Sequence, residues 1–120
     1  MARKICVATV LAVAGFAMAV WFSASLAQAA DLEVNIDQFA FAPQHITVKA
    51  GTTVTWSNKD DVPHTVASSS KLFKSNALDT NDKFSFTFTT PGTYEYFCSL
   101  HPHMTATIVV EAATGSSAAQ

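Results

Sequence analysis

Apolar and polar residues alternate along most of the chain, and this period of two is typical of half-buried β-strands. The clearest example is the segment 84–88, in which three phenylalanines are separated by Ser85 and Thr87. The segment that begins at Asp31 follows the same rule, and its alternation continues through Phe39 and Phe41 until Pro43 ends it. Further short strands are predicted at 46–48, 52–58, 64–67, 94–98 and 105–111.

No segment after residue 30 shows a helical period, and turn signals such as Pro91-Gly92 separate the predicted strands. The stretch 68–82 is polar and irregular. We expect Leu72, Phe73 and Leu78 to anchor it to the core, with at most one short helical turn. The pattern predicts an all-β sandwich or barrel of about seven or eight strands.

The amino-terminal segment has a different composition from the rest of the chain. Arg3 and Lys4 precede an apolar run over 5–22, and Ala27-Gln28-Ala29 forms a small-x-small cleavage signal. We predict that residues 1–29 are a cleaved secretory signal peptide and that the protein is exported to the periplasm. The alternative is an uncleaved membrane anchor, because the apolar run is about long enough to span a bilayer. Residues 30–111 then form one domain, and 112–120 a flexible tail.

Charge and cysteine content narrow the possible functions. After residue 29 the chain carries nine acidic residues and five lysines without a basic cluster, which argues against nucleic-acid binding. Cys98 is the only cysteine in that part. Exported proteins usually pair their cysteines, so a lone thiol needs protection. It is either an inert buried residue or a metal ligand.

The surroundings of Cys98 favour the metal. Cys98, His101 and Met104 have the spacing C-x2-H-x2-M directly after a predicted strand, and Pro63-His64 offers a second imidazole. Two imidazoles and a thiolate in a plane, with a weak axial thioether, suit copper that alternates between Cu(I) and Cu(II). A c-type haem site would need a second cysteine, and structural zinc would not select a thioether.

The chain has two other histidines, His45 and His103. His103 could replace His101 as a ligand, but neighbouring residues in an extended segment point to opposite sides, so His103 and Met104 would not serve one ion well. We therefore expect His103 at the rim of the site. His45 lies in a predicted loop before a strand, and we expect no role for it at the site.

These motifs resemble the cupredoxins, the small blue copper proteins, and within them the amicyanin and plastocyanin group. The similar segments are 46–51, 54–56, 63–64, 84–88, 91–94, 98–104 and 108–110. The resemblance implies a cupredoxin-like Greek-key β-sandwich with one copper ion held by His64, Cys98, His101 and Met104. The family often has Asn after its first histidine, connecting that strand to the ligand loop. Thr65 stands there, and we expect Thr65 with Ser99 to make the connection differently.

The resemblance also implies a one-electron carrier rather than an enzyme. We expect a monomer that docks transiently with donor and acceptor proteins near His101, which Leu100 and Pro102 surround; Phe97 offers a second path. One alternative is a copper-binding or delivery protein without a carrier role. Another is an enzyme with Cys98 as nucleophile. That reading leaves Met104 and one histidine unexplained.

Overall fold

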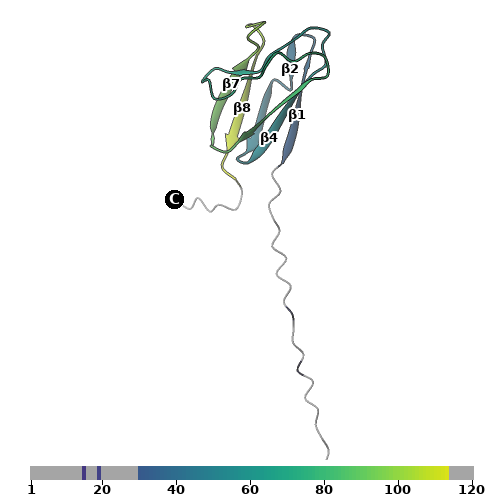
Figure 1. The fold of residues 1–120 in the computed structure, drawn as a ribbon. Helices are drawn as coiled ribbons and strands as arrows, with labels where there is room; N and C mark the ends of the chain where they lie inside the picture. Colours follow the sequence, from purple (N-terminus) through teal and green to yellow (C-terminus); the bar gives the residue numbers. More distant parts are fainter. Residues whose placement is uncertain (1–14, 16–18, 20–29, 114–120) are drawn as a thin grey trace, which may run out of the picture.

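A computed structural model describes residues 15, 19 and 30–113 and contains eight β-strands in this range (Figure 1). It confirms the predicted all-β fold and the number of strands. The predicted signal peptide and most of the predicted tail lie outside the described residues. The strands are β1 (Asp31–Asp37), β2 (Ala40–Ala42), β3 (His45–Lys49), β4 (Thr52–Asn58), β5 (Ala67–Ser68), β6 (Lys83–Phe88), β7 (Gly92–Phe97) and β8 (Thr105–Glu111).

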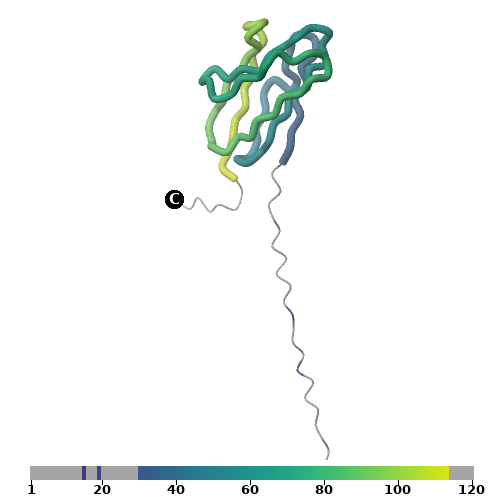
Figure 2. The backbone as a smooth tube through the Cα atoms, in the orientation of Figure 1, coloured from purple at the N-terminus to yellow at the C-terminus, as the bar shows by residue number. Residues whose placement is uncertain are grey.

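The strands form two four-stranded sheets, ordered β2-β1-β4-β6 and β3-β8-β7-β5. Two pairs are parallel, β1 with β4 and β3 with β8, and the others are antiparallel. Within the described range, no helix is long and apolar enough to cross a bilayer. The loop between β7 and β8 lies at the upper end of the sandwich in Figure 2, whereas residues 30 and 113 lie at the lower end.

An aromatic cluster fills the space between the sheets. Trp56 of β4 is fully buried, and its ring centroid lies 5.4 Å from that of Tyr96 on β7 and 5.7 Å from that of Phe73. Phe41 of β2 packs edge-on against Tyr96 at 4.7 Å. Because these rings come from both sheets and from the irregular segment, they hold the two layers together.

The prediction that the first strand continues to Pro43 was wrong. The chain reverses at Gln38 and Phe39, and β2 pairs antiparallel with β1. Both turn residues have left-handed backbone angles, with φ values of 51° and 57°. Such a turn normally uses Asn or Gly. Here the carboxylate of Asp60 accepts both backbone N–H groups, at 2.6 Å and 2.9 Å, and stabilises it.

The segment 68–82 contains no helical turn, and only two of its three predicted anchors enter the core. Phe73 and Leu78 are each 6% exposed, whereas Leu72 is 51% exposed. Backbone bonds between Phe73 and Ser68 and between Ser75 and Val66 keep the chain extended there. Neighbouring residues of an extended chain face opposite ways, so Phe73 and Leu72 cannot both be buried.

Replacing Phe73 should therefore destabilise the protein far more than replacing its neighbour. We expect Phe73→Ala to lower the free energy of unfolding by about 3–5 kcal/mol, because it leaves a cavity beside Trp56. Leu72→Ala, the matched control, should change it by less than about 0.5 kcal/mol. Urea unfolding followed by Trp56 fluorescence measures both. Equal losses would contradict this account of the segment.

The hydroxyl group of Tyr96 is buried beside Trp56, and it has no hydrogen-bond partner among the described residues. Burial raises the pKa of Tyr96 to about 12, against a smaller opposing effect of the Trp56 indole. An unfolded tyrosine ionises near pH 10, so the unfolded state loses this proton first. The contribution of Tyr96 to stability is thus complete below about pH 10 and is lost as the pH rises toward about 12.

Tyr96→Phe should remove this pH dependence. Near neutral pH we expect the variant to be within about 1 kcal/mol of the wild type or more stable, because the hydroxyl is unsatisfied. Between about pH 10 and pH 11.5 the free energy of unfolding of the variant should increase relative to that of the wild type. Urea unfolding of both proteins across this range measures the difference. A constant difference at every pH would show that Tyr96 ionises equally in both states.

Candidate metal centre

The segment that leads from β4 to His64 is held by the buried side chain of Asn58. Its Nδ2 donates to the carbonyl oxygens of Val62 and Leu78, at 2.9 Å and 2.8 Å. Its Oδ1 accepts the backbone N–H of Asp60 at 2.9 Å. The backbone of His64 then exchanges two hydrogen bonds with Leu78, at 3.1 Å and 2.7 Å. These bonds fix where His64 enters the site.

His64 is fully buried, and its two ring nitrogens face different partners. Nε2 lies 2.7 Å from Oδ2 of Asp60, and Nδ1 lies 3.7 Å from Sγ of Cys98. A carboxylate accepts hydrogen bonds, so the proton belongs on Nε2. That tautomer leaves the Nδ1 lone pair free to bind a metal beside the sulfur.

Asp60 supports this arrangement from the outside. Burial acts to raise the pKa of Asp60, but hydrogen bonds from the backbone N–H groups of Phe39 and Gln38 and from His64 outweigh it and lower the pKa. The carboxylate therefore stays ionised at neutral pH. One side chain thus holds the left-handed turn and orients His64.

The loop after β7 is closed by its own backbone. The N–H of His101 donates to the carbonyl of Cys98 at 3.2 Å, and that of Met104 donates to His101 at 2.9 Å. The N–H of Cys98 in turn donates to the carbonyl of Met104 at 3.1 Å. This places Nδ1 of His101 3.6 Å from Sγ of Cys98. Cys98 and Met104 both belong to the buried core cluster.

Thr65 connects the His64 segment to this loop. Its backbone N–H points at Sγ of Cys98 at 3.3 Å, and its hydroxyl lies 3.8 Å from the same sulfur. The hydroxyl also accepts the backbone N–H of Ser99 at 2.7 Å and lies 2.7 Å from the Ser99 hydroxyl. Thr65 and Ser99 thus make the connection that we expected in place of the family's asparagine.

The donor atoms have a spacing suited to one metal ion. The ligand atoms of His64, Cys98 and His101 all lie within 4.8 Å of one another. Metal–sulfur and metal–nitrogen bonds of about 2.3 and 2.0 Å, at an angle near 120°, separate the donors by about 3.7 Å. The observed 3.6 Å and 3.7 Å from Sγ to the two nitrogens match this value. The donor set fits a soft metal such as copper.

The remaining histidines lie outside this group. His103 is exposed, and its ring centroid is 6.4 Å from that of His101. His45 opens β3, an edge strand of its sheet, and pairs with Thr107. Neither contributes an atom to the donor cluster of the described residues.

Phe39 and Asp60 are site residues that the sequence analysis missed. The Phe39 ring stands edge-on to His64 at 5.4 Å and to His101 at 5.1 Å, and it is 47% exposed. Its place in the site depends on a turn without Gly or Asn, for which the sequence carries no signal. Asp60 could have been found, because it precedes His64 by four residues in a polar turn.

Comparison with known proteins gives consistent matches. Amicyanin-alpha of Methylorubrum extorquens is 38% identical over 90 residues, which cover 71% of this chain and 76% of that protein. A purple cupredoxin of Nitrosopumilus maritimus superposes with a TM-score of 0.63 at 33% identity, covering 68% of this chain and all of that one.

An enzyme is also among the structural matches. The copper-containing nitrite reductase of Thermus scotoductus superposes with a TM-score of 0.64 at 28% identity, but only 22% of its chain is covered. The family model for the cupredoxin-like domain matches residues 9–110. The predicted resemblance is confirmed, and the chain belongs to the cupredoxin family.

Proposed function

We propose that His64, Cys98, His101 and Met104 hold one copper ion and that the protein carries single electrons between partner proteins in the periplasm. The observation that carries this proposal is the convergence of the Cys98 sulfur with two imidazole nitrogens, at Sγ–Nδ1 distances of 3.6 Å and 3.7 Å. A buried methionine lies in the same loop. The match to amicyanin-alpha supports it.

Bound copper supplies a Cu(I)/Cu(II) couple, and the protein's residues keep the site alike in both states. The Asp60 carboxylate holds His64 from behind, and Thr65 holds Cys98 and Ser99 in one register. Burial of Cys98 and Met104 excludes water. A site with little freedom to rearrange needs little reorganisation when an electron arrives, which favours fast transfer.

Electrons pass most directly through the edge of His101. It is the one donor residue of the trio that is not fully buried. Apolar groups surround it, since Leu100 is 52% exposed and Phe39 47% exposed, and Pro102 is also exposed. A small apolar patch of this kind suits transient docking of a monomer with redox partners. Reactive cysteines are usually partly exposed, whereas Cys98 is fully buried. Its burial therefore argues against the alternative that the protein is an enzyme with Cys98 as nucleophile.

The copper site can be tested by its colour. Cu(II) added to the mature protein should give an intense visible thiolate-to-copper band, and Cys98→Ser should abolish it. His103→Ala should keep the band, whereas His101→Ala should lose or strongly alter it. A colourless wild type would refute the carrier function. If His103→Ala lost the band and His101→Ala kept it, the second histidine ligand would be His103 instead of His101. Copper that a mild chelator removes rapidly would favour the delivery alternative.

The hydroxyl of Thr65 should control how firmly copper is held. Thr65→Val keeps the shape and the backbone N–H but leaves the Ser99 N–H without its acceptor, at a cost of about 1–2 kcal/mol. We expect copper release to a chelator to be about tenfold faster, which corresponds to about 1.4 kcal/mol. Thr65→Ser keeps the hydroxyl and is the matched control. Equal release rates in the two variants would show that the hydroxyl has no such role.

A further inference from the structure

A cleft lies between the end of β7 and the edge strand β5, beside the chain neighbours of Cys98. Its volume is about 360 Å³, within the usual range for small-molecule sites. Phe97 and Ser99, which flank Cys98 in sequence, form part of its wall. Strand β5 and the irregular segment supply the rest of the wall, the latter through Phe73 and the two lysines Lys71 and Lys74.

Backbone contacts fix the main chain of both lysines beside the cleft. The N–H of Lys71 donates to the carbonyl of Ser68 at 3.0 Å, and Lys71 has a left-handed backbone conformation with φ of 64°. Lys74 forms an isolated bridge with Ala67, which itself pairs with Phe97. In the part of the chain that the structure describes, neither lysine makes an ion pair. The cleft therefore combines an apolar wall with two uncompensated positive charges.

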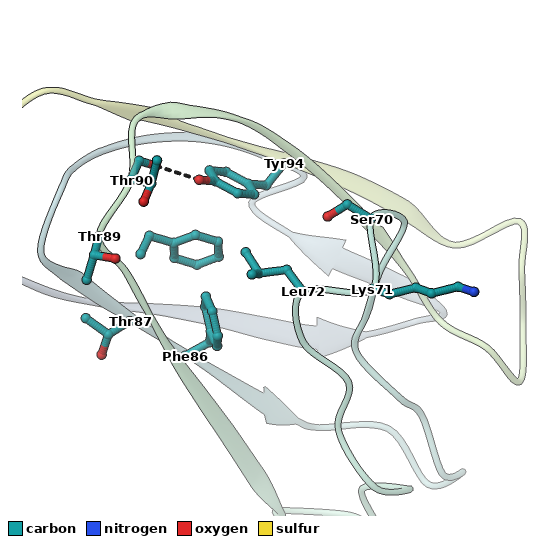
Figure 3. Close-up of a pocket in the computed structure, with 9 residues that line it drawn as sticks. Ser70, Lys71, Leu72, Phe86, Thr87, Thr89, Thr90 and Tyr94 are labelled. Atoms are coloured by element: carbon teal, nitrogen blue, oxygen red, sulfur yellow. Dashed lines mark hydrogen bonds between the residues drawn. The ribbon is translucent and has the colours of Figure 1, made fainter.

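A larger cleft nearby lacks these properties. It has a volume of about 490 Å³ and lies between the segment 70–72 and the turn that joins β6 to β7. Figure 3 shows Leu72, Phe86 and Tyr94 around an aromatic interior, with the ammonium end of Lys71 directed away from it. No other charged residue lines this cleft. It offers shape but no charge to select a ligand.

We propose that the cleft beside Phe97 binds a small aromatic carboxylate. Half-buried Phe97 and the small exposed part of Phe73 form an apolar wall for a flat ligand, and Lys71 and Lys74 provide partners for its carboxylate. Charge-assisted hydrogen bonds to carboxylates are stronger than neutral ones, so the charge gives selectivity over neutral aromatics. The volume suits a ligand of one or two rings.

This site is coupled to the metal centre, and that part of the inference rests on the proposed copper function. Ser99 on the cleft wall shares two hydrogen bonds with Thr65, whose N–H points at Sγ of Cys98. A bound anion stabilises the more positively charged oxidised site. By reciprocity the oxidised protein binds the anion more tightly, and the anion lowers the reduction potential.

Binding is tested with 2-naphthoate as the probe and neutral 2-naphthamide as its control. In NMR titrations of the Cu(I) protein we expect saturable shifts confined to residues 67–74 and 97–99. Lys71→Gln and Lys74→Gln should each raise the Kd about fivefold, the upper range for an exposed charge pair. Lys83→Gln, on β6, should leave the Kd unchanged, and 2-naphthamide should bind about tenfold more weakly.

Three results would overturn the binding site. The NMR shifts could fail to saturate at about 10 mM 2-naphthoate, they could occur at residues elsewhere, or the Kd could be the same in the Lys71→Gln and Lys74→Gln variants as in the wild type. The coupling has its own readout. Saturating 2-naphthoate should lower the reduction potential of the wild type but not that of a variant that carries both Lys71→Gln and Lys74→Gln. An unchanged potential in the wild type would overturn the coupling. The copper-free protein can be titrated in the same way. A colourless protein after addition of Cu(II) would therefore refute the proposed function, and the titration would still test whether the cleft binds 2-naphthoate.

Discussion

The metal centre depends on the hydrogen bonds by which Thr65 joins two segments 33 residues apart in sequence. Neither segment could form the site alone, because the loop supplies the sulfur and one imidazole and the segment between β4 and β5 supplies the second imidazole. Bringing such distant residues together costs chain entropy, which only the packed core can offset. Trp56, Tyr96 and the rings around them thus fix the donor positions as much as the loop does.

Much of the site could be predicted from sequence because its chemistry is local. Cys98, His101 and Met104 lie close together in one loop. The alternation along β7 predicted that Cys98, the next residue, points inward. The Phe39 turn could not be predicted, since its left-handed residues are stabilised by a carboxylate distant in sequence. Leu72 was misassigned for a related reason. In an irregular segment, tertiary hydrogen bonds decide which neighbour faces the core.

The alternation along β7 also separates two tasks. Cys98 points inward to the donors, while Phe97 and Ser99 lie on the other side and line a cleft. One donor residue, His101, lies near the surface at the apolar patch, whereas the chain neighbours Phe97 and Ser99 separate buried Cys98 from the positively charged cleft. These surfaces differ in charge and shape, so different classes of molecule can contact the site without competing for one face.

The position of the chain ends has a practical consequence. Residues 30 and 113 lie at the end of the sandwich farthest from the ligand loop (Figure 2). Any attachment there, whether a lipid-embedded leader, a fused domain or a linker to an electrode, leaves the His101 edge pointing outward. A protein immobilised through either end would therefore present the edge of His101 to the solution. The fold is thus suited to attachment on an electrode with its metal centre accessible to soluble redox proteins.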